Sequence, residues 1–386
     1  MKTNRYLQLL IKVSRQCNLR CVYCNDWRAE SPTLSLAHFE RLCVTALNDT
    51  FHTGVVFVWH GGEPTMVPVD YYEEVVKIQA RANVKGLPVI NVLQTNAAHL
   101  SDRWIDFLKR QDFGLSISLD GPPEVHGINR PTVGGRSSFP LVARTMQRLR
   151  QEDLPFGVLF VLSEDLLALG AEKTWAFIEE LGLTEVDFVP ARPPNLPGGI
   201  KRSPTIAPQF VYNERWTAFM RDIFDIWWDG GSQVRIKMLD SVMSRLIDAA
   251  PELCLVGGGC FGTVFSVEPE GHINVCDVFH GEELFQLGEL SADTFATIGK
   301  SARLAGVIRW NEDRLEGLRA CPYFELCNGG CPHDAVIYES YGARSLIDGC
   351  CGWAPLFEHV MRRAGADLAR ASGRQLLSVS PHRSEV

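Results

Sequence analysis

Cys17-Asn-Leu-Arg-Cys21-Val-Tyr-Cys24 places three cysteines on one short stretch, shortly after the apolar run Leu7–Val13. Three thiolates do not complete a four-coordinate zinc site without a fourth ligand. They can bind three irons of a [4Fe–4S] cluster and leave the fourth iron open. An open iron is a coordination site for a substrate or a cofactor. The alternative is a structural zinc site completed by a distant histidine.

Strand and helix patterns alternate after this loop. Apolar runs predict strands at Leu7–Val13, Val55–Trp59, Val89–Gln94, Phe113–Leu119, Phe156–Leu162 and Glu185–Val189. Helical spacing predicts helices at Leu36–Asn48, Val69–Arg81, Asp102–Lys109, Ser138–Arg150 and Glu172–Leu181. Six such units imply a parallel sheet with helical crossovers, too few for a closed eight-stranded barrel. The predicted fold class is α/β, a partial (β/α)6 TIM-like barrel with chemistry at the C-terminal strand ends.

Two further motifs follow predicted strands: Gly61-Gly62-Glu63-Pro64 and Thr95-Asn96. Together with the cysteine loop they resemble the radical S-adenosylmethionine (SAM) enzymes, over about residues 7–190. The resemblance implies that the open iron chelates the amino and carboxylate groups of SAM. It also implies that one electron cleaves SAM to methionine and a 5′-deoxyadenosyl radical, which removes a hydrogen atom from the substrate.

The same resemblance assigns cofactor contacts residue by residue. Gly61, Gly62, Glu63 and Pro64 match the motif whose backbone bonds the methionine amino group, and Tyr23 matches the residue beside the adenine. Asn96 belongs to the third-strand motif. Ser118, Asp120 and Arg130 match a fourth-strand motif that includes His126, with Ser118 at the ribose or methionine end. Turn capping and a salt bridge are the alternative roles for Ser118, Asp120 and Arg130.

A second set of cysteines follows a long cysteine-free stretch, and its members are Cys254, Cys260, Cys276, Cys321, Cys327, Cys331, Cys350 and Cys351. Their spacing resembles the SPASM extension, which carries two auxiliary [4Fe–4S] clusters. The resemblance assigns the first cluster to Cys254, Cys260, Cys276 and Cys331. It assigns the second to Cys321, Cys327 and one of Cys350 and Cys351, because the position expected to hold another cysteine is Leu318. Either the spare cysteine of the pair compensates, or that site is open or has a different ligand; zinc knuckles are the alternative.

Asp277 directly follows Cys276. In the resembling sulfatase-maturase branch, an aspartate at this position takes the proton as the substrate radical is oxidised. We expect an anionic cluster and partial burial to raise its pKa toward neutrality, as a general base requires. A surface or helix-capping aspartate is the alternative.

The patterns predict four regions: the radical SAM partial barrel at 1–209, a helical connection at 210–250, the SPASM domain at 251–353, and a C-terminal helix and tail at 354–386. Residues 191–209 are rich in proline and glycine and predict a long loop. The apolar stripe of Tyr212–Asp229 predicts a core-facing helix. Cys43, within a helical apolar pattern, predicts a buried structural thiol.

Composition limits the possible partners and compartment. The 386 residues are 46% hydrophobic and carry a net charge of −8 without a long basic run, which argues against nucleic-acid binding. No long apolar stretch or secretory signal is evident, so we expect no membrane contact and a cytoplasmic location. Clustered cysteines in a reducing compartment favour metal binding. Radical SAM chemistry also implies an electron donor of the flavodoxin or ferredoxin type.

Three candidate reactions begin with the same removal of a hydrogen atom by the 5′-deoxyadenosyl radical. The favoured one is a carbon–carbon cross-link in a ribosomal precursor peptide, because Ser118–Phe139 (SLDGPPEVHGINRPTVGGRSSF) resembles cyclophane-forming maturases. The others are formylglycine formation in a sulfatase, and dehydrogenation or epimerisation of a small molecule such as an aminoglycoside. Only sixteen residues precede Cys17, so a peptide's leader would bind the barrel mouth, the 191–209 loop or a separate protein. An iron–sulfur protein without enzymatic activity would leave the SAM motifs unexplained.

Overall fold

The computed structural model describes residues 6–24, 26–48, 51–192, 213–279, 283–340 and 349–373. Within them, one ten-stranded sheet runs in the order β10-β9-β8-β1-β2-β3-β4-β5-β6-β7. The barrel strands are parallel: β1 (Tyr6–Ser14), β2 (Gly54–Gly61), β3 (Val89–Thr95), β4 (Phe113–Ser118), β5 (Gly157–Leu162) and β6 (Glu185–Pro190). The short strand β7 (Arg235–Ile236) extends that edge in parallel. The predicted partial (β/α)6 barrel is thus confirmed.

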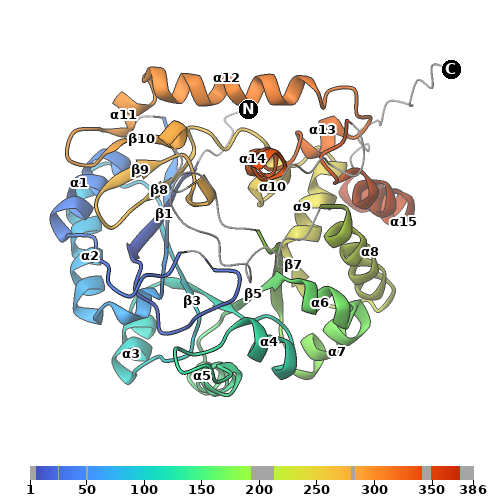
Figure 1. Cartoon of the computed structure of the whole chain (residues 1–386), viewed down its shortest axis with the longest axis horizontal. Coiled ribbons are helices and arrows are strands. Elements are labelled where there is room, and N and C mark those ends of the chain that lie inside the picture. The colour runs from blue at the N-terminus through green and yellow to red at the C-terminus, as the bar shows by residue number, and fades with distance from the viewer. Residues whose placement is uncertain are drawn as a thin grey trace.

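Helices cover the outside of these strands, as Figure 1 shows. The crossover helices are α1 (Leu36–Leu47), α2 (Val69–Ala82), α3 (Asp102–Arg110), α5 (Phe139–Gln151) and α7 (Ala171–Glu180). Short helices α4 (Pro123–Asn129) and α6 (Glu164–Leu169) follow β4 and β5 and were not predicted. Cys43 lies fully buried in α1, as predicted. Trp59, Tyr72 and Trp104 pack edge to face and tie β2, α2 and α3 together.

The cysteine-rich region continues the barrel sheet. Its strand β8 (Val264–Val267) pairs in parallel with β1 at Gln8–Ile11. β9 (His272–Asn274) and β10 (Gln286–Glu289) then add antiparallel strands. This arrangement leaves β1 between two parallel neighbours and brings Cys276, just after β9, toward the barrel mouth. Strands β8 and β9 both lie within the predicted SPASM region.

Further helices frame the C-terminal region: α8 (Asn213–Asp229), α9 (Lys237–Leu246), α10 (Cys254–Gly257), α11 (Phe295–Ile298), α12 (Ala302–Glu316), α13 (Phe324–Cys327), α14 (Pro332–Ser340) and α15 (Ala354–Ser372). The predicted core-facing stripe of α8 is buried at Trp216, Phe219, Met220 and Ile223. Most of the predicted loop at 191–209, and the tail beyond residue 373, lie outside the described residues. Among the helices that the structure describes, none is long and apolar enough to cross a membrane.

Candidate functional site

The loop that carries Cys17, Cys21 and Cys24 leaves the C-terminal end of β1 and is held from the opposite side of the barrel. Arg20 N donates to Pro131 O at 2.8 Å and Val22 N donates to Asn129 O at 2.9 Å. The clamping residues, Asn129 and Pro131, lie at the end of α4 and just beyond it, within the stretch that resembles cyclophane-forming maturases. The backbone of this segment therefore helps to hold the cysteine loop in place.

The three thiols are largely buried, and backbone N–H groups point at two of them. Leu19 N lies 3.4 Å from Cys17 Sγ, and Asp26 N lies 3.4 Å from Cys24 Sγ. Burial raises the pKa of Cys17 to about 11 and that of Cys21 to about 12. Amide donors at sulfur stabilise thiolates that bind an iron–sulfur cluster. Three thiols on one amide-lined loop fit the open-iron cluster that the sequence predicts.

Gly61 and Gly62 bring the end of β2 against the start of the cysteine loop. Gly61 has φ +122°, and a Cβ on Gly62 would lie 2.2 Å from Gln16 O. Glu63 N donates to Gln16 O at 2.7 Å. The Glu63 carboxylate accepts bonds from Thr95 Oγ1 at 2.7 Å and from Asn96 N at 2.7 Å, so it joins β2 to β3. Pro64 begins a single 3-10 turn after it.

Asn96, at the end of β3, faces the first thiol. Its Nδ2 lies 2.8 Å from Asn18 Oδ1 and 3.7 Å from Cys17 Sγ. The third-strand motif thus lies beside the cysteine loop, as expected from its place at a strand end.

Tyr23, Asp120 and Arg130 form a buried polar group at the end of β4. Tyr23 Oη donates to Asp120 Oδ2 at 2.6 Å, and Arg130 Nε lies 3.0 Å from the same oxygen. The Arg130 guanidinium lies 5.5 Å from the Tyr23 ring centroid and reaches Cys21 Sγ at 3.9 Å. The alternative salt bridge is therefore present, while the cofactor contacts of these residues stay a prediction. Nearby, Ser118 Oγ accepts from Gln94 Nε2 at 2.9 Å.

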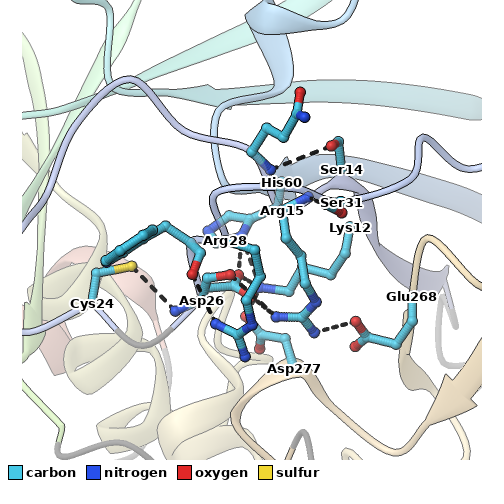
Figure 2. A network of polar contacts seen from close by, with 12 residues as sticks. Lys12, Ser14, Arg15, Cys24, Asp26, Arg28, Ser31, His60, Glu268 and Asp277 are labelled. Carbon is cyan, nitrogen blue, oxygen red and sulfur yellow. Dashed lines mark hydrogen bonds and ion pairs between the residues drawn. The ribbon is translucent and has the colours of Figure 1, made fainter. Parts of the chain in front are cut away.

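A buried charge network that sequence analysis missed joins the cysteine loop to the C-terminal region (Figure 2). Lys12 Nζ, near the end of β1, lies 2.6 Å from Asp26 Oδ2 and 3.2 Å from Asp277 Oδ2. Lys12 Nζ also lies 3.0 Å from Nδ1 of His60, the residue that precedes Gly61. A lysine inside the apolar run Leu7–Val13 was the signal that could have revealed it, since unpaired lysines are almost never buried.

Arg15 extends the same network. Its guanidinium pairs with Asp26 and with Glu268, which directly follows β8. Lys12 and Arg15 therefore form ion pairs with three carboxylates, and the five residues come from four separate segments of the chain. The carboxylates are those of Asp26, Glu268 and Asp277. The network places Asp26, two residues after Cys24, and Asp277, next to Cys276, on either side of one ammonium group.

Asp277 differs from the expectation in its pKa. Burial raises the pKa of its carboxyl group, but the Lys12 ammonium and His60 outweigh burial and leave it below its ordinary value. Burial and Lys12 lower the pKa of His60 to about 4, so its imidazole is neutral near pH 7. Lys12, missed in the sequence, supplies a counter-charge that the expectation did not include. The rise in the Asp277 pKa that an anionic cluster would cause stays a prediction.

The cysteines of the first predicted auxiliary set lie in one region of the structure. Cys276 lies within electrostatic reach of Cys254 and Cys331, and Cys331 within reach of Cys254 and Cys260. The set draws on α10, the segment after β9 and the segment before α14. These four cysteines, far apart in the sequence, are thus near enough to influence one another electrostatically, and Cys276 Sγ lies 3.4 Å from Asp277 Oδ1.

The remaining cysteines form a second group, composed of Cys321, Cys327, Cys350 and Cys351. Cys351 Sγ lies 3.4 Å from Cys327 Sγ. Cys350 shares hydrogen bonds with Cys321 and with Cys351. No three His, Cys, Asp or Glu side chains in the described ranges converge on a single metal ion. In an iron–sulfur cube, each thiolate binds its own iron.

Comparison with known proteins agrees with this geometry. The model of the radical SAM superfamily matches residues 11–165. Those residues form a radical SAM domain. The cofactors of radical SAM proteins are a [4Fe–4S] cluster and SAM, and SAM is bound in solved structures with this fold. The cysteine-rich region that follows this radical SAM domain is consistent with a SPASM extension and fits auxiliary clusters.

Two curated relatives match nearly end to end. The cysteine-type anaerobic sulfatase-maturating enzyme of Clostridium perfringens is 26% identical over 369 residues, which cover 92% of this chain and 97% of that enzyme. The serine-type anaerobic sulfatase-maturating enzyme of Bacteroides thetaiotaomicron is 26% identical over 376 residues, covering 92% and 89%.

Solved structures share the fold. The structure of anSMEcpe with bound AdoMet and the Cp18Cys peptide matches with a TM-score of 0.80 at 24% identity, covering 95% of this chain and 99% of that one. Streptococcus suis SuiB bound to precursor peptide SuiA matches with a TM-score of 0.60 at 15% identity, covering 86% and 73%. The radical SAM barrel and the cysteine-rich region therefore occur together in one known architecture.

Proposed function

We propose that this protein is a radical SAM enzyme that oxidises a side chain of a polypeptide substrate, with Asp277 accepting the proton. The observation that carries the proposal is the position of Asp277, between the charge network of the radical SAM domain and the first auxiliary cysteine group. Its end-to-end similarity to sulfatase-maturating enzymes and its fold similarity to SuiB with a bound precursor peptide support a polypeptide substrate.

The oxidation removes a hydrogen atom, then one electron and one proton, from a substrate carbon and its neighbouring atom. When bound, SAM and its cluster supply the acceptor for the hydrogen atom, and the auxiliary clusters accept the electron. A residue of the chain itself accepts the proton. Asp277 carries an ionised carboxylate, Lys12 fixes its Oδ2 at 3.2 Å, and its other oxygen faces Cys276. A carboxylate within hydrogen-bond reach of the reacting group can act as the general base.

Two products remain as candidates. A cross-link between an aromatic ring and a neighbouring side chain is favoured by the resemblance of residues 118–139 to cyclophane-forming maturases. Formylglycine is favoured by the relatives, which match more of the chain than that stretch does. The clamp from residues 129–131 onto the cysteine loop gives the stretch a structural purpose of its own and weakens it as evidence for cross-linking. A small-molecule substrate is the third candidate.

Anaerobic turnover with candidate peptides distinguishes these products. Cross-linking links two residues in tandem mass spectra and leaves no aldehyde. Formylglycine reacts with a hydrazide probe at a single former cysteine or serine. Modification of an aminoglycoside and of no peptide would contradict the proposed substrate class. An electron donor of the flavodoxin or ferredoxin type, a separate leader-binding protein and a cytoplasmic location belong to the same proposal.

Asp277→Asn tests the proton step. The variant keeps the shape of the side chain but removes its basicity, and loss of a general base slows turnover by about a hundred- to ten-thousand-fold. We expect 5′-deoxyadenosine still to form while oxidised product falls by that factor, as measured by chromatography of both. Product formation at the wild-type rate would place the base elsewhere.

A further inference from the structure

The vicinal pair Cys350-Cys351 is the feature of the second cysteine group that the family pattern leaves unexplained. Cys351 Sγ lies 3.4 Å from Cys327 Sγ, while Cys350 is hydrogen-bonded to Cys321. The two adjacent residues therefore reach two different partners of one group. Cys350 and Cys351 are also hydrogen-bonded to each other, so the four sulfurs form one connected group.

Local backbone geometry explains how neighbouring side chains can both face inward. Gly349 and Gly352 flank the pair with φ values of +70° and +89°, which favour glycine and allow a tight turn on each side. Asn213 Nδ2 donates to Cys351 O at 2.7 Å and fixes the turn against α8. A Cβ on Gly352 would lie 2.5 Å from Asn213 Cβ, so the close approach requires glycine.

Backbone amides surround this group of sulfurs. Gly352 N lies 3.2 Å from Cys350 Sγ, and the backbone of Ala354 bonds the same thiol. The backbone of Tyr323 bonds Cys321, and that of Gly329 bonds Cys327. Converging N–H donors form a favourable environment for anionic groups, and hydrogen bonds to sulfur are typical of iron–sulfur ligands.

Two alternatives to a role for both cysteines in this group are weaker. One is a ligand supplied by position 318, and the other is a role for Cys351 in the first auxiliary group. Leu318 has no ligating atom, and its Cδ1 lies 3.3 Å from the position of a Cβ on Gly329, so it fills space where the family pattern has cysteine. The first auxiliary group already contains four thiols, Cys254, Cys260, Cys276 and Cys331, and does not need Cys351.

We propose that Cys321, Cys327, Cys350 and Cys351 form one complete four-thiolate iron–sulfur centre, in which the vicinal pair supplies two ligands and replaces the cysteine absent at Leu318. Because all four ligands are thiolates, this centre has no open iron for substrate. Its role is therefore electron transfer or structural support, and not substrate binding. This proposal holds whichever polypeptide or small molecule the enzyme oxidises.

The test compares Cys350→Ala, Cys351→Ala and Cys321→Ala in the full chain, reconstituted anaerobically with iron and sulfide. Alanine is used because a serine oxygen could itself bind iron. We expect each variant to lose about four irons per chain relative to the parent, together with the same component of the Mössbauer spectrum. Cys43→Ala, which alters a buried thiol in α1, is the matched control and should keep all iron. Full iron in either the Cys350→Ala or the Cys351→Ala variant overturns the proposal, as does zinc without sulfide at this site.

Differential alkylation of the unaltered protein covers the case in which the variants fail to fold. With clusters in place, both Cys350 and Cys351 should resist iodoacetamide, and both should react after iron is chelated. Peptide mass spectrometry reads the two positions separately. Modification of only one of them in the loaded protein would show that the pair does not bind as a unit.

Discussion

Lys12 shows how one buried residue can organise a site. Burial lowers the pKa of its ammonium group, but Asp26 and Asp277 outweigh burial and raise it above the ordinary value. The side chain is therefore charged, and it pairs with two carboxylates that lie far apart in the sequence. Removing one member of such a buried group leaves the others without compensation, which is far more damaging than removing a surface pair.

Lys12→Met should therefore destabilise the protein by about 3–5 kcal/mol. The methionine fills a similar volume, so the loss reports mainly the uncompensated carboxylate of Asp277, because Asp26 keeps its ion pair with Arg15. Denaturant unfolding under anaerobic conditions measures it. Lys77→Met is the control, because Lys77 pairs with Glu74 on the surface with 61% of its side chain exposed, and we expect a change below about 0.5 kcal/mol. Equal effects of the two substitutions would contradict the structural role of the network.

Gly62→Ala tests the contact between the end of β2 and the cysteine loop. The new Cβ would lie 2.2 Å from Gln16 O and 2.5 Å from Arg15 O, so the backbone that leads into Cys17 must move. We expect lost or weakened SAM binding by equilibrium dialysis and less iron bound by the first cluster. Gly134→Ala, with nothing within 4 Å of its added Cβ, should bind both normally. Normal SAM binding by Gly62→Ala would mean that this close approach is unimportant.

At the scale of elements, a single carboxylate joins β6 to α9. Asp187 Oδ1 accepts from Met238 N at 3.1 Å, in the first turn of α9, whose N-cap residue Ile236 offers no side-chain bond. Burial raises the pKa of Asp187 to about 6. Because the folded pKa exceeds the unfolded one, the fold favours the protonated form, and stability falls as the pH rises from about 4 to 6.

Asp187→Asn should therefore stabilise the protein at pH 7.5 by about 1–3 kcal/mol. Asparagine keeps an oxygen for the α9 amide and removes the buried charge. The gain should shrink by about half at pH 5, where the unfolded carboxylate is largely ionised but the folded one is not. Thermal unfolding at both pH values measures this, with Asp187→Ala as the variant that loses the bond. A lower melting temperature for Asp187→Asn at pH 7.5 would contradict the sign.

The sequence predicted elements whose pattern is local, and missed those that depend on distant contacts. Strands β1 to β6 are apolar runs at regular spacing, so the partial barrel could be predicted. In contrast, α12 buries only Leu304 and Val307 among its described core residues, which leaves little periodic signal. The two cysteine groups were expected because their spacing resembles that of the SPASM extension. The Lys12–Asp277 contact joins residues 265 positions apart, and nothing in either local stretch indicates the other.

For the whole molecule, the sheet is the structure that unites the barrel with the cysteine-rich region. Residues Gln8–Ile11 of β1 form a parallel ladder with β8, and charges from Arg15 and Lys12 continue the junction to Glu268 and Asp277. The predicted boundary at residue 251 therefore does not separate two sheets. An unpaired β1 would expose backbone donors and acceptors along an apolar strand, a common cause of aggregation.

A chain that ends at Ala250 should consequently fail to remain a folded monomer. It would lose the β8 ladder from β1 and the carboxylate partners Glu268 and Asp277, while Asp26 alone would remain beside Lys12 and Arg15. Size-exclusion chromatography and circular dichroism should show aggregation or loss of structure. Simultaneous production of residues 251–386 as a separate chain should restore the monomer-sized complex, because the ladder and ion pairs need no covalent connection. If the shorter chain alone were monomeric, folded and able to bind SAM, the sheet junction would not be what holds the radical SAM domain together.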